Sequence, residues 1–502
     1  MVQQYLSLFL FLILFVPVVL SQETQSLGDV ARGLKARKNG ATTNSPASPA
    51  APATNAAPVR VPRTAGLQQS AAPALLATAP AVVPDLNPNV VTDMRGLEKY
   101  QAAFRQLFAQ ERFEEIDQLA TEARRTKARF PGGFWKISVI YHAISLPPAA
   151  HNGSDLEWGQ HLARLERWVQ QRPGSITARV ALGWFYDNYG WKARGGGYGD
   201  SVSEDGWRLL AERAHMGRKV LEEAQALPEK DPEWYVAMMS IATAESWDSE
   251  QTNALFEKAI AFEPEYYYYY QTQAESLLPK WGGNEGDAAK FADAIADRIG
   301  GKKGDLIYYH IGKSLNCACD NDLQLTGMSW PRLRRGYAVL EELHGTTIAH
   351  VNAMAYMAEH SRDFEFAKVL LTQIGENWDT TLWPKREDFE VAKRYVNDNI
   401  VRYYYSVATE SAKSAEGKAF STAVIETVNQ KYRQQILDCV KNNSSVVPKI
   451  GVLIKLGKDG DVQRILGAPY DAPEACFRSP LEKAMFTPPP KPDFWVAVNL
   501  NF

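Results

Sequence analysis

Apolar side chains recur at steps of three and four residues through most of the middle of the chain. Such spacing puts one apolar stripe on each helix. Two of these stripes are Leu97, Tyr100, Phe104, Leu107 and Phe108, and then Phe113, Ile116, Leu119, Ala120 and Ala123. Proline and glycine clusters, as at Pro131-Gly132-Gly133, interrupt the pattern and divide it into helices of ordinary globular length. We therefore predict a mainly α-helical domain over residues 93–405.

One segment of this region has the character of a helical repeat. Residues 254–264 look like the second helix of a tetratricopeptide unit with its terminal proline. Residues 266–270 would open the next helix. They are five consecutive tyrosines, which point to all sides of a helix, so this helix should be packed on more than one side. Because no strict repeat period runs through the region, the pattern predicts a degenerate tetratricopeptide-like α-α array.

The pattern changes type after residue 418. Apolar, β-branched runs separated by an Asp459-Gly460 dipeptide are a strong hairpin signal, and strict alternation marks the end of the chain as a strand. The predicted order is a helix (424–440), a strand (449–457), a strand (462–466), a helix (473–486) and a closing strand (494–502). Residues 418–502 are therefore expected to form a small α+β domain.

The N-terminus is apolar from Tyr5 to Leu20, and small residues follow this run. A short apolar run with Val19 and Ser21 at the −3 and −1 positions indicates a secretory signal peptide over residues 1–21, cut before Gln22. A membrane span needs about 20 apolar residues, and this run is shorter, which favours cleavage. Retention as an uncleaved anchor is the alternative. Residues 22–92 are rich in Ala, Pro, Thr, Ser and Asn, a composition that predicts a disordered tether.

Charge and cysteine content narrow the environment of the protein. The net charge of the 502 residues is −3, so no basic footprint for nucleic acid exists. Four cysteines in an exported chain suggest disulfides. Cys439 and Cys476 are the favoured pair, because both lie in the small C-terminal region. Cys317 and Cys319 flank a single residue, where a bridge would be strained, so free thiols remain an equal alternative for them.

Several motifs of the helical region resemble a bacterial domain of unknown function, number 4034. They are the segments Phe113–Asp117, Phe130–Lys136, Trp191–Gly195 and Pro279–Gly283. The resemblance would extend over residues 96–405. It implies a helical, tetratricopeptide-like fold with no known activity, so no functional residue can be carried over.

The C-terminal region resembles the TonB C-terminal superfamily, in the variant found at the ends of gliding-motility-type proteins. The residues that carry this resemblance are Gly451–Ile454, Asp459-Gly460, Phe486–Pro489 and Phe502. In that variant a Cys on the first helix and a Cys on the second suggest a bridge, and Cys439 and Cys476 occupy those places. The true TonB family has a longer anchor and a charged spacer, so the resemblance implies envelope location and protein–protein contact.

One glycine-rich loop is the strongest candidate for binding chemistry. In Trp191–Asp200, Arg194 would hold a carboxylate, and Trp191 and Tyr198 would wall a pocket. No strand precedes the loop and no Gly-Lys-Ser/Thr follows, so it is neither a P-loop nor a dinucleotide fingerprint. A purely structural inter-helix loop is the alternative. Trp281, in Pro279–Gly283, is a second candidate, against a helix stop with a docked tryptophan.

No catalytic or metal signature occurs in the sequence. The chain lacks Gly-x-Ser-x-Gly and His-Glu-x-x-His, so we expect no enzyme activity, no cofactor and no metal. We predict a periplasmic or secreted cell-envelope protein that acts as a protein–protein interaction or scaffold module and binds a protein or peptide partner. The alternatives are a small-molecule-binding protein or enzyme that uses residues 191–200, and a membrane-anchored TonB-like transducer. Membrane contact is expected only if the N-terminal segment is retained.

Overall fold

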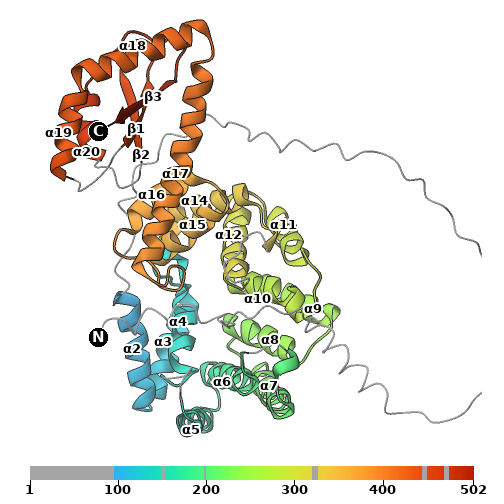
Figure 1. Ribbon diagram of the computed structural model, residues 1–502. Coiled ribbons are helices and arrows are strands. Elements are labelled where there is room, and N and C mark those ends of the chain that lie inside the picture. The colour runs from blue at the N-terminus through green and yellow to red at the C-terminus, as the bar shows by residue number, and fades with distance from the viewer. Residues whose placement is uncertain are drawn as a thin grey trace, which may run out of the picture. The chain divides into compact units, whose positions relative to one another are not determined.

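The protein is a mainly helical chain with a small C-terminal sheet. The computed structural model describes residues 95–148, 153–196, 199–318, 326–443, 449–468 and 474–501. These residues form 18 α-helices and one three-stranded antiparallel sheet, so the predicted fold class is confirmed. The predicted signal peptide and tether, together with Tyr198 and Cys319, lie outside the described residues. The chain divides into two compact units between His344 and Gly345, and each is described by itself (Figure 1).

The first unit is built only of helices. Consecutive helices pack against each other, most extensively α6 with α7 and α12 with α14. The helices are α2 (Arg95–Ala109), α3 (Phe113–Thr126), α4 (Lys136–Ile144), α5 (Asp155–Gln171), α6 (Ile176–Arg194), α7 (Glu204–Ala224), α8 (Pro232–Ala244), α9 (Ser249–Phe262), α10 (Tyr268–Ser276), α11 (Asp287–Ile299), α12 (Gly301–Ala318) and α14 (Trp330–His344). Short 3₁₀ turns are η2 (Pro131–Gly133), η3 (Gly199–Ser201) and η4 (Pro279–Trp281). The tetratricopeptide-like arrangement stays a prediction.

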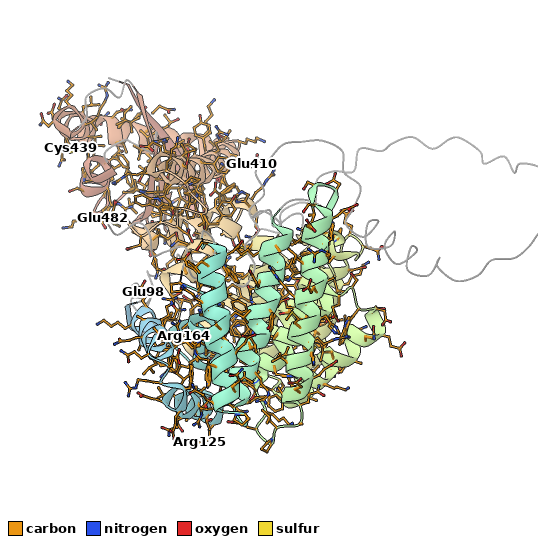
Figure 2. The ribbon with its side chains drawn as sticks, turned by 90° about the horizontal axis from the view of Figure 1, so that it is seen from below. Glu98, Arg125, Arg164, Glu410, Cys439 and Glu482 are labelled. Atoms are coloured by element: carbon orange, nitrogen blue, oxygen red, sulfur yellow. A yellow bond between two sulfur atoms is a disulfide. The ribbon has the colours of Figure 1, made fainter. Side chains whose placement is uncertain are left out.

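Helix α3 shows how the apolar stripes position these helices. Phe113, Ile116 and the two alanines of its predicted stripe are buried, whereas Leu119 is 41% exposed. An apolar stripe on a helix packs against the rest of the unit and leaves charged residues on the opposite face. Charged side chains such as Glu98 and Arg125 accordingly lie on the outer surface of the unit (Figure 2).

The five consecutive tyrosines lie in the centre of the first unit. Residues 266–270 are all at least 93% buried, which confirms that this segment is packed on more than one side. Helix α10 contacts α8, α9, α11 and α12, so every face of it meets another helix. The ring of Tyr267 stacks on His310 at 3.8 Å between centroids. Burying these aromatic rings removes their apolar surface from water, which stabilises the unit.

The last helix of the first unit packs against a segment near the beginning of that unit. η2 packs against α14, and an Arg129 guanidinium nitrogen lies 3.0 Å from Nε2 of His344, 215 positions later. Arg129 also pairs with Glu265, which precedes α10. The early segment before α4 is therefore held by the middle and by the last helix of the same unit.

The second unit combines helices with the sheet. Its elements are α15 (Ile348–His360), α16 (Phe364–Ile374), α17 (Arg386–Ser411), α18 (Ala415–Lys431), α19 (Arg433–Asn443), β1 (Lys449–Leu456), β2 (Val462–Ala468), α20 (Glu474–Leu481) and β3 (Phe494–Asn501). The strand order is β2-β1-β3 and both pairs are antiparallel. The predicted hairpin is present, with the Asp459-Gly460 dipeptide between β1 and β2.

Both faces of this sheet are covered by helices. Alternate residues such as Val452 and Val496 form a core with helices α18, α19 and α20. On the opposite face, α17 packs on the sheet, and Tyr404 stacks on Trp495 at 4.1 Å between ring centroids. Helix α17 therefore packs on the sheet, and the second unit begins at Gly345, ahead of the 405–418 interval in which the sequence pattern changes.

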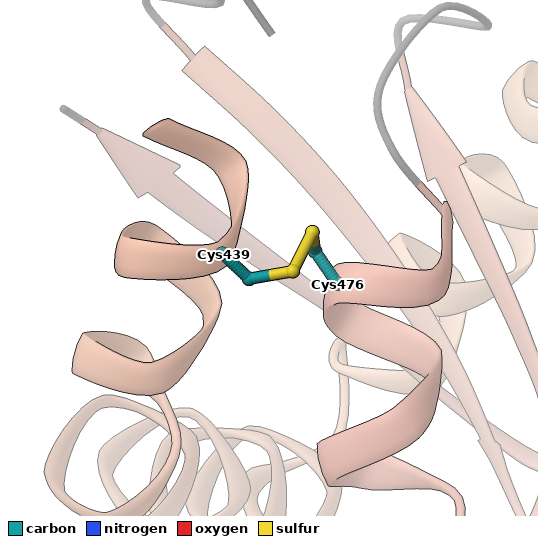
Figure 3. Close-up of a disulfide and its surroundings, with 2 residues drawn as sticks. All are labelled: Cys439 and Cys476. Carbon is teal, nitrogen blue, oxygen red and sulfur yellow. A yellow bond between two sulfur atoms is a disulfide. The ribbon is translucent and has the colours of Figure 1, made fainter. Parts of the chain in front are cut away.

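A disulfide fastens α19 to α20. Cys439 and Cys476 are bonded, with 5.4 Å between their Cα atoms (Figure 3). Cys476 is buried and Cys439 packs against the sheet core. The bridge closes a loop that contains the hairpin, so it restricts the unfolded chain over most of the sheet.

Candidate functional site

Helix α6 ends at the glycine-rich loop that the sequence singles out. Gly195 has φ +80°, a conformation that favours glycine, and its N–H donates to the carbonyl of Trp191 at 3.0 Å. The helix therefore ends at Arg194. Lys192 and Arg194 lie in its last turn, where the negative end of the helix dipole favours cations. This local structure places Trp191 and Arg194 side by side at one end of the helix.

The second candidate tryptophan is carried by η4. Gly283 makes this turn feasible, because a Cβ atom there would lie 1.8 Å from the carbonyl oxygen of Leu277. The chain leaves α10, makes a single 3₁₀ turn and crosses back over its own backbone. Trp281 is the last residue of that turn. Any side chain at position 283 would therefore force the backbone of this loop to move.

The structure brings the two candidate tryptophans together. The rings of Trp191 and Trp281 lie 5.3 Å apart between centroids with planes at 70°, an edge-to-face contact between residues 90 positions apart. Both indoles are partly exposed. The Arg194 guanidinium lies 5.0 Å from the ring of Trp207 and 5.8 Å from that of Trp191. We call these four residues the tryptophan–arginine cluster.

Arg194 is mostly buried within this cluster. Its side chain donates to the carbonyl of Gly195 at 2.9 Å, and the residue is 7% exposed. Burial lowers the pKa of the guanidinium, because a low-dielectric surrounding disfavours its charge. Cations over aromatic rings gain electrostatic energy from the π face. Tyr198, the remaining predicted wall of the pocket, lies outside the described residues.

A buried carboxylate that the sequence did not single out accepts a hydrogen bond from one tryptophan of the cluster. Asp187 is 2% exposed and accepts hydrogen bonds from Trp191 Nε1 at 3.2 Å and from Ser240 Oγ at 2.7 Å. Burial raises the pKa of this carboxyl to about 7, and the two hydrogen bonds oppose the rise. Asp187 precedes Trp191 by four residues, one helical turn, and that spacing was the signal available in the sequence.

Two further cation–aromatic contacts flank the cluster. Lys192 pairs with Asp155 at 2.9 Å and lies 5.6 Å from the ring of Trp158. Arg213 donates to the carbonyl of Tyr189 at 2.6 Å and covers its ring. The end of α6 therefore carries several positive charges on aromatic faces.

A buried polar network lies elsewhere in the unit, around the start of α8. Asp231 accepts from Arg124 and from the hydroxyl of Tyr141, each at 2.6 Å. Glu233 accepts from Trp184 Nε1 at 3.0 Å and from the hydroxyl of Tyr266. Each of these carboxylates is bonded to side chains of its own unit, an arrangement typical of a structural core network.

Burial controls the ionisation of this network. It raises the pKa of Glu233 to about 7, an effect that the donors to its carboxylate oppose. For Arg124, burial alone would lower the pKa, but the charge of Asp231 and the other acids raises it. Arg124 is therefore a permanent cation that compensates the buried carboxylate.

The remaining candidates from the sequence are two cysteines, Cys317 and Cys319. Cys317 is partly buried on α12, whereas Cys319 lies outside the described residues. Within the part of the chain that the structure describes, no group of three His, Cys, Asp or Glu side chains is placed to hold a metal ion. Among the same residues, no helix combines the length and the apolar content needed to cross a bilayer.

Comparison with known families gives one match. Residues 100–249 match the model of a domain of unknown function (DUF4034). This confirms the predicted resemblance over those residues, which include most of the tryptophan–arginine cluster but not Trp281. The likeness of the C-terminal part to TonB domains stays a prediction. No curated protein and no solved structure matches the chain.

Proposed function

We propose that this chain is an exported cell-envelope protein that acts as a protein-interaction module rather than as an enzyme. The Cys439–Cys476 bridge supports export, because disulfides persist in oxidising compartments such as the periplasm. The apolar N-terminal run with small residues before Gln22 is the second support. The partner would be a protein or peptide of the envelope.

The observation that carries the interaction role is the contact between Trp191 and Trp281. Two partly exposed indoles from distant segments meet beside Arg194, and the buried Asp187 fixes one of them. Tryptophan and arginine are the residues most enriched where protein interfaces gain their binding energy. Positive charge at the end of α6 favours a partner segment that carries carboxylates next to apolar groups.

Paired tryptophan variants test this role. Trp281→Ala removes one indole of the pair, and Trp247→Ala is the matched control, since Trp247 is also partly exposed in a loop of the same unit. We expect a protein captured from envelope extract by the intact chain to be lost with Trp281→Ala and kept with Trp247→Ala. Equal capture by both variants would exclude the tryptophan–arginine cluster as the binding surface.

A small-molecule carboxylate is the second candidate ligand. The burial that lowers the pKa of Arg194 also means that its charge is poorly solvated, so an anion near it would be favoured. Arg194→Met should then abolish binding of small carboxylates measured by calorimetry. Full binding by this variant would refute the role of Arg194.

The transducer alternative differs in the fate of the N-terminus. The intact mass of protein from envelope fractions distinguishes the two proposals. A chain that begins at Gln22 agrees with a periplasmic or secreted module. A chain that retains Met1 favours an anchored, TonB-like protein.

A further inference from the structure

Helix α17 carries an apolar and charged stripe on its outer side. Of the outward residues, Val391 is 53%, Tyr395 is 48% and Tyr405 is 50% exposed, unusual values for large apolar side chains. Asp398 and Arg402 lie between the two tyrosines on the same side of the helix. The five residues are spaced by four, three, four and three positions, which is the seam spacing of paired helices. We call them the α17 stripe.

The opposite side of α17 fixes the helix in place. Val396, Ile400 and Tyr404 are buried, and the Tyr404 ring stacks on Trp495 of β3. The Arg464 side chain of β2 reaches both Glu365 and the Tyr404 hydroxyl. The 26-residue helix is thus held by the sheet and by α16, and the stripe lies on an ordered support.

The stripe is complementary to itself when it is turned end to end. A two-fold axis at position 400 relates position 398 to position 402 and position 395 to position 405. In an antiparallel pair of α17 helices, Asp398 of one copy therefore faces Arg402 of the other, and Tyr395 faces Tyr405. An interface of this isologous kind needs only one patch that matches its own rotated image.

The two charged residues have unused pairing capacity. Within the described ranges, neither the Asp398 carboxylate nor the Arg402 guanidinium forms a hydrogen bond or an ion pair. Most of the other charges on this helix do, as Lys393 does with Glu390 and Arg386 with Glu376. Opposite charges that face each other across an interface favour one register and one partner orientation.

We propose that the α17 stripe binds the same stripe of a second copy of this chain in an antiparallel arrangement. The inference is independent of the partner proposed for the tryptophan–arginine cluster, because the two surfaces lie on different units. A single pair of helices buries less than the roughly 1,600 Å² of a standard interface. The dimer is therefore weak, concentration-dependent and more stable at low salt than at high salt.

Charge reversal in the full chain tests the pairing. Asp398→Arg places two arginines opposite each other at both symmetric contacts, and Arg402→Asp does the same with two carboxylates. We expect sedimentation velocity to show the dissociation constant raised roughly tenfold or more by either change. The double variant Asp398→Arg/Arg402→Asp restores opposite charges across the interface and should recover dimerisation. Circular dichroism of all variants reports whether α17 remains folded.

Two tyrosine variants provide a matched control. Tyr405→Ser removes a stripe residue, whereas Tyr403→Ser removes a neighbour of similar exposure, 53%, that lies off the stripe. Dimerisation should weaken with the first and remain unchanged with the second. A wild-type chain that stays monomeric at high concentration and low salt would overturn the proposal, as would a double charge variant no better than either single variant. Equal effects of the two tyrosine changes would also contradict the proposal, because they would show that the α17 stripe is not the interface.

Discussion

Asp187→Asn tests whether ionisation of the buried Asp187 carboxyl, which is hydrogen-bonded to Trp191, destabilises the folded protein. The carboxyl has an ordinary pKa of 3.8, and burial raises this to about 7 in the folded protein. Between these two values the native state holds a proton that the unfolded chain has released. The free energy of unfolding therefore falls as pH rises through this window, and it is level again above about pH 7.

The size of the effect follows from the shift in pKa. One pH unit corresponds to about 1.4 kcal/mol for one proton. Over the window from 3.8 to about 7, the ionisation of Asp187 costs the folded protein roughly 4 kcal/mol. Asparagine carries no charge, so the variant lacks this loss. Its amide oxygen still accepts from Trp191, and Ser240 can turn its hydroxyl to accept from the amide nitrogen.

Urea unfolding of the two proteins from about pH 4 to about pH 8.5 measures the difference. We expect wild-type stability minus variant stability to fall by about 1.4 kcal/mol per pH unit up to about pH 7 and then to stay constant. Burial also raises the pKa of Glu233 to about 7 and that of Glu275 to about 8, but both residues are present in both proteins, so their contributions cancel. Parallel stability curves at all pH values would refute the reasoning.

Two further predictions concern stability. Gly283→Ala should destabilise the first unit by about 1–3 kcal/mol in urea unfolding, because the new Cβ would lie 1.8 Å from the Leu277 carbonyl oxygen. Gly96→Ala is the control and should have little effect, because its Cβ has open space. Replacement of Cys439 and Cys476 by serine opens a loop of 37 residues and should cost about 4 kcal/mol, measured by urea unfolding of the full chain. Reduced wild-type protein should match the serine variant, and a serine variant as stable as the oxidised wild type would contradict this prediction.

Short-range patterns accounted for most of the fold. Helical spacing, the Asp459-Gly460 hairpin signal and the alternation in β3 each depend on neighbours in sequence, and the structure agrees with them. Leu119 shows the limit, because periodicity placed it in the stripe of α3 although it is 41% exposed. Periodicity assigns a residue to a face of the helix, but packing against neighbouring elements decides how much of that face is buried.

The site was less predictable because its parts come from distant segments. Trp191 and Trp281 were each singled out by their glycine-rich surroundings, but nothing in the sequence indicates that the two rings meet. Asp187 looked like an ordinary polar residue of a helix, and its role depends on Ser240 from another helix. The place of α17 against the sheet depends on contacts of the same long-range kind, such as that of Tyr404 with Trp495.

The packing of α14 against η2 affects how the first unit folds and whether it tolerates truncation. In an open repeat array each repeat touches only its neighbours, so terminal repeats can be removed and the remainder stays folded. Here the contact of Arg129 with His344 joins positions 215 residues apart. Removal of α14 therefore exposes packed surface at the beginning of the unit as well as at its end. The chain must also close a very long loop before this contact forms, and that entropic cost slows folding.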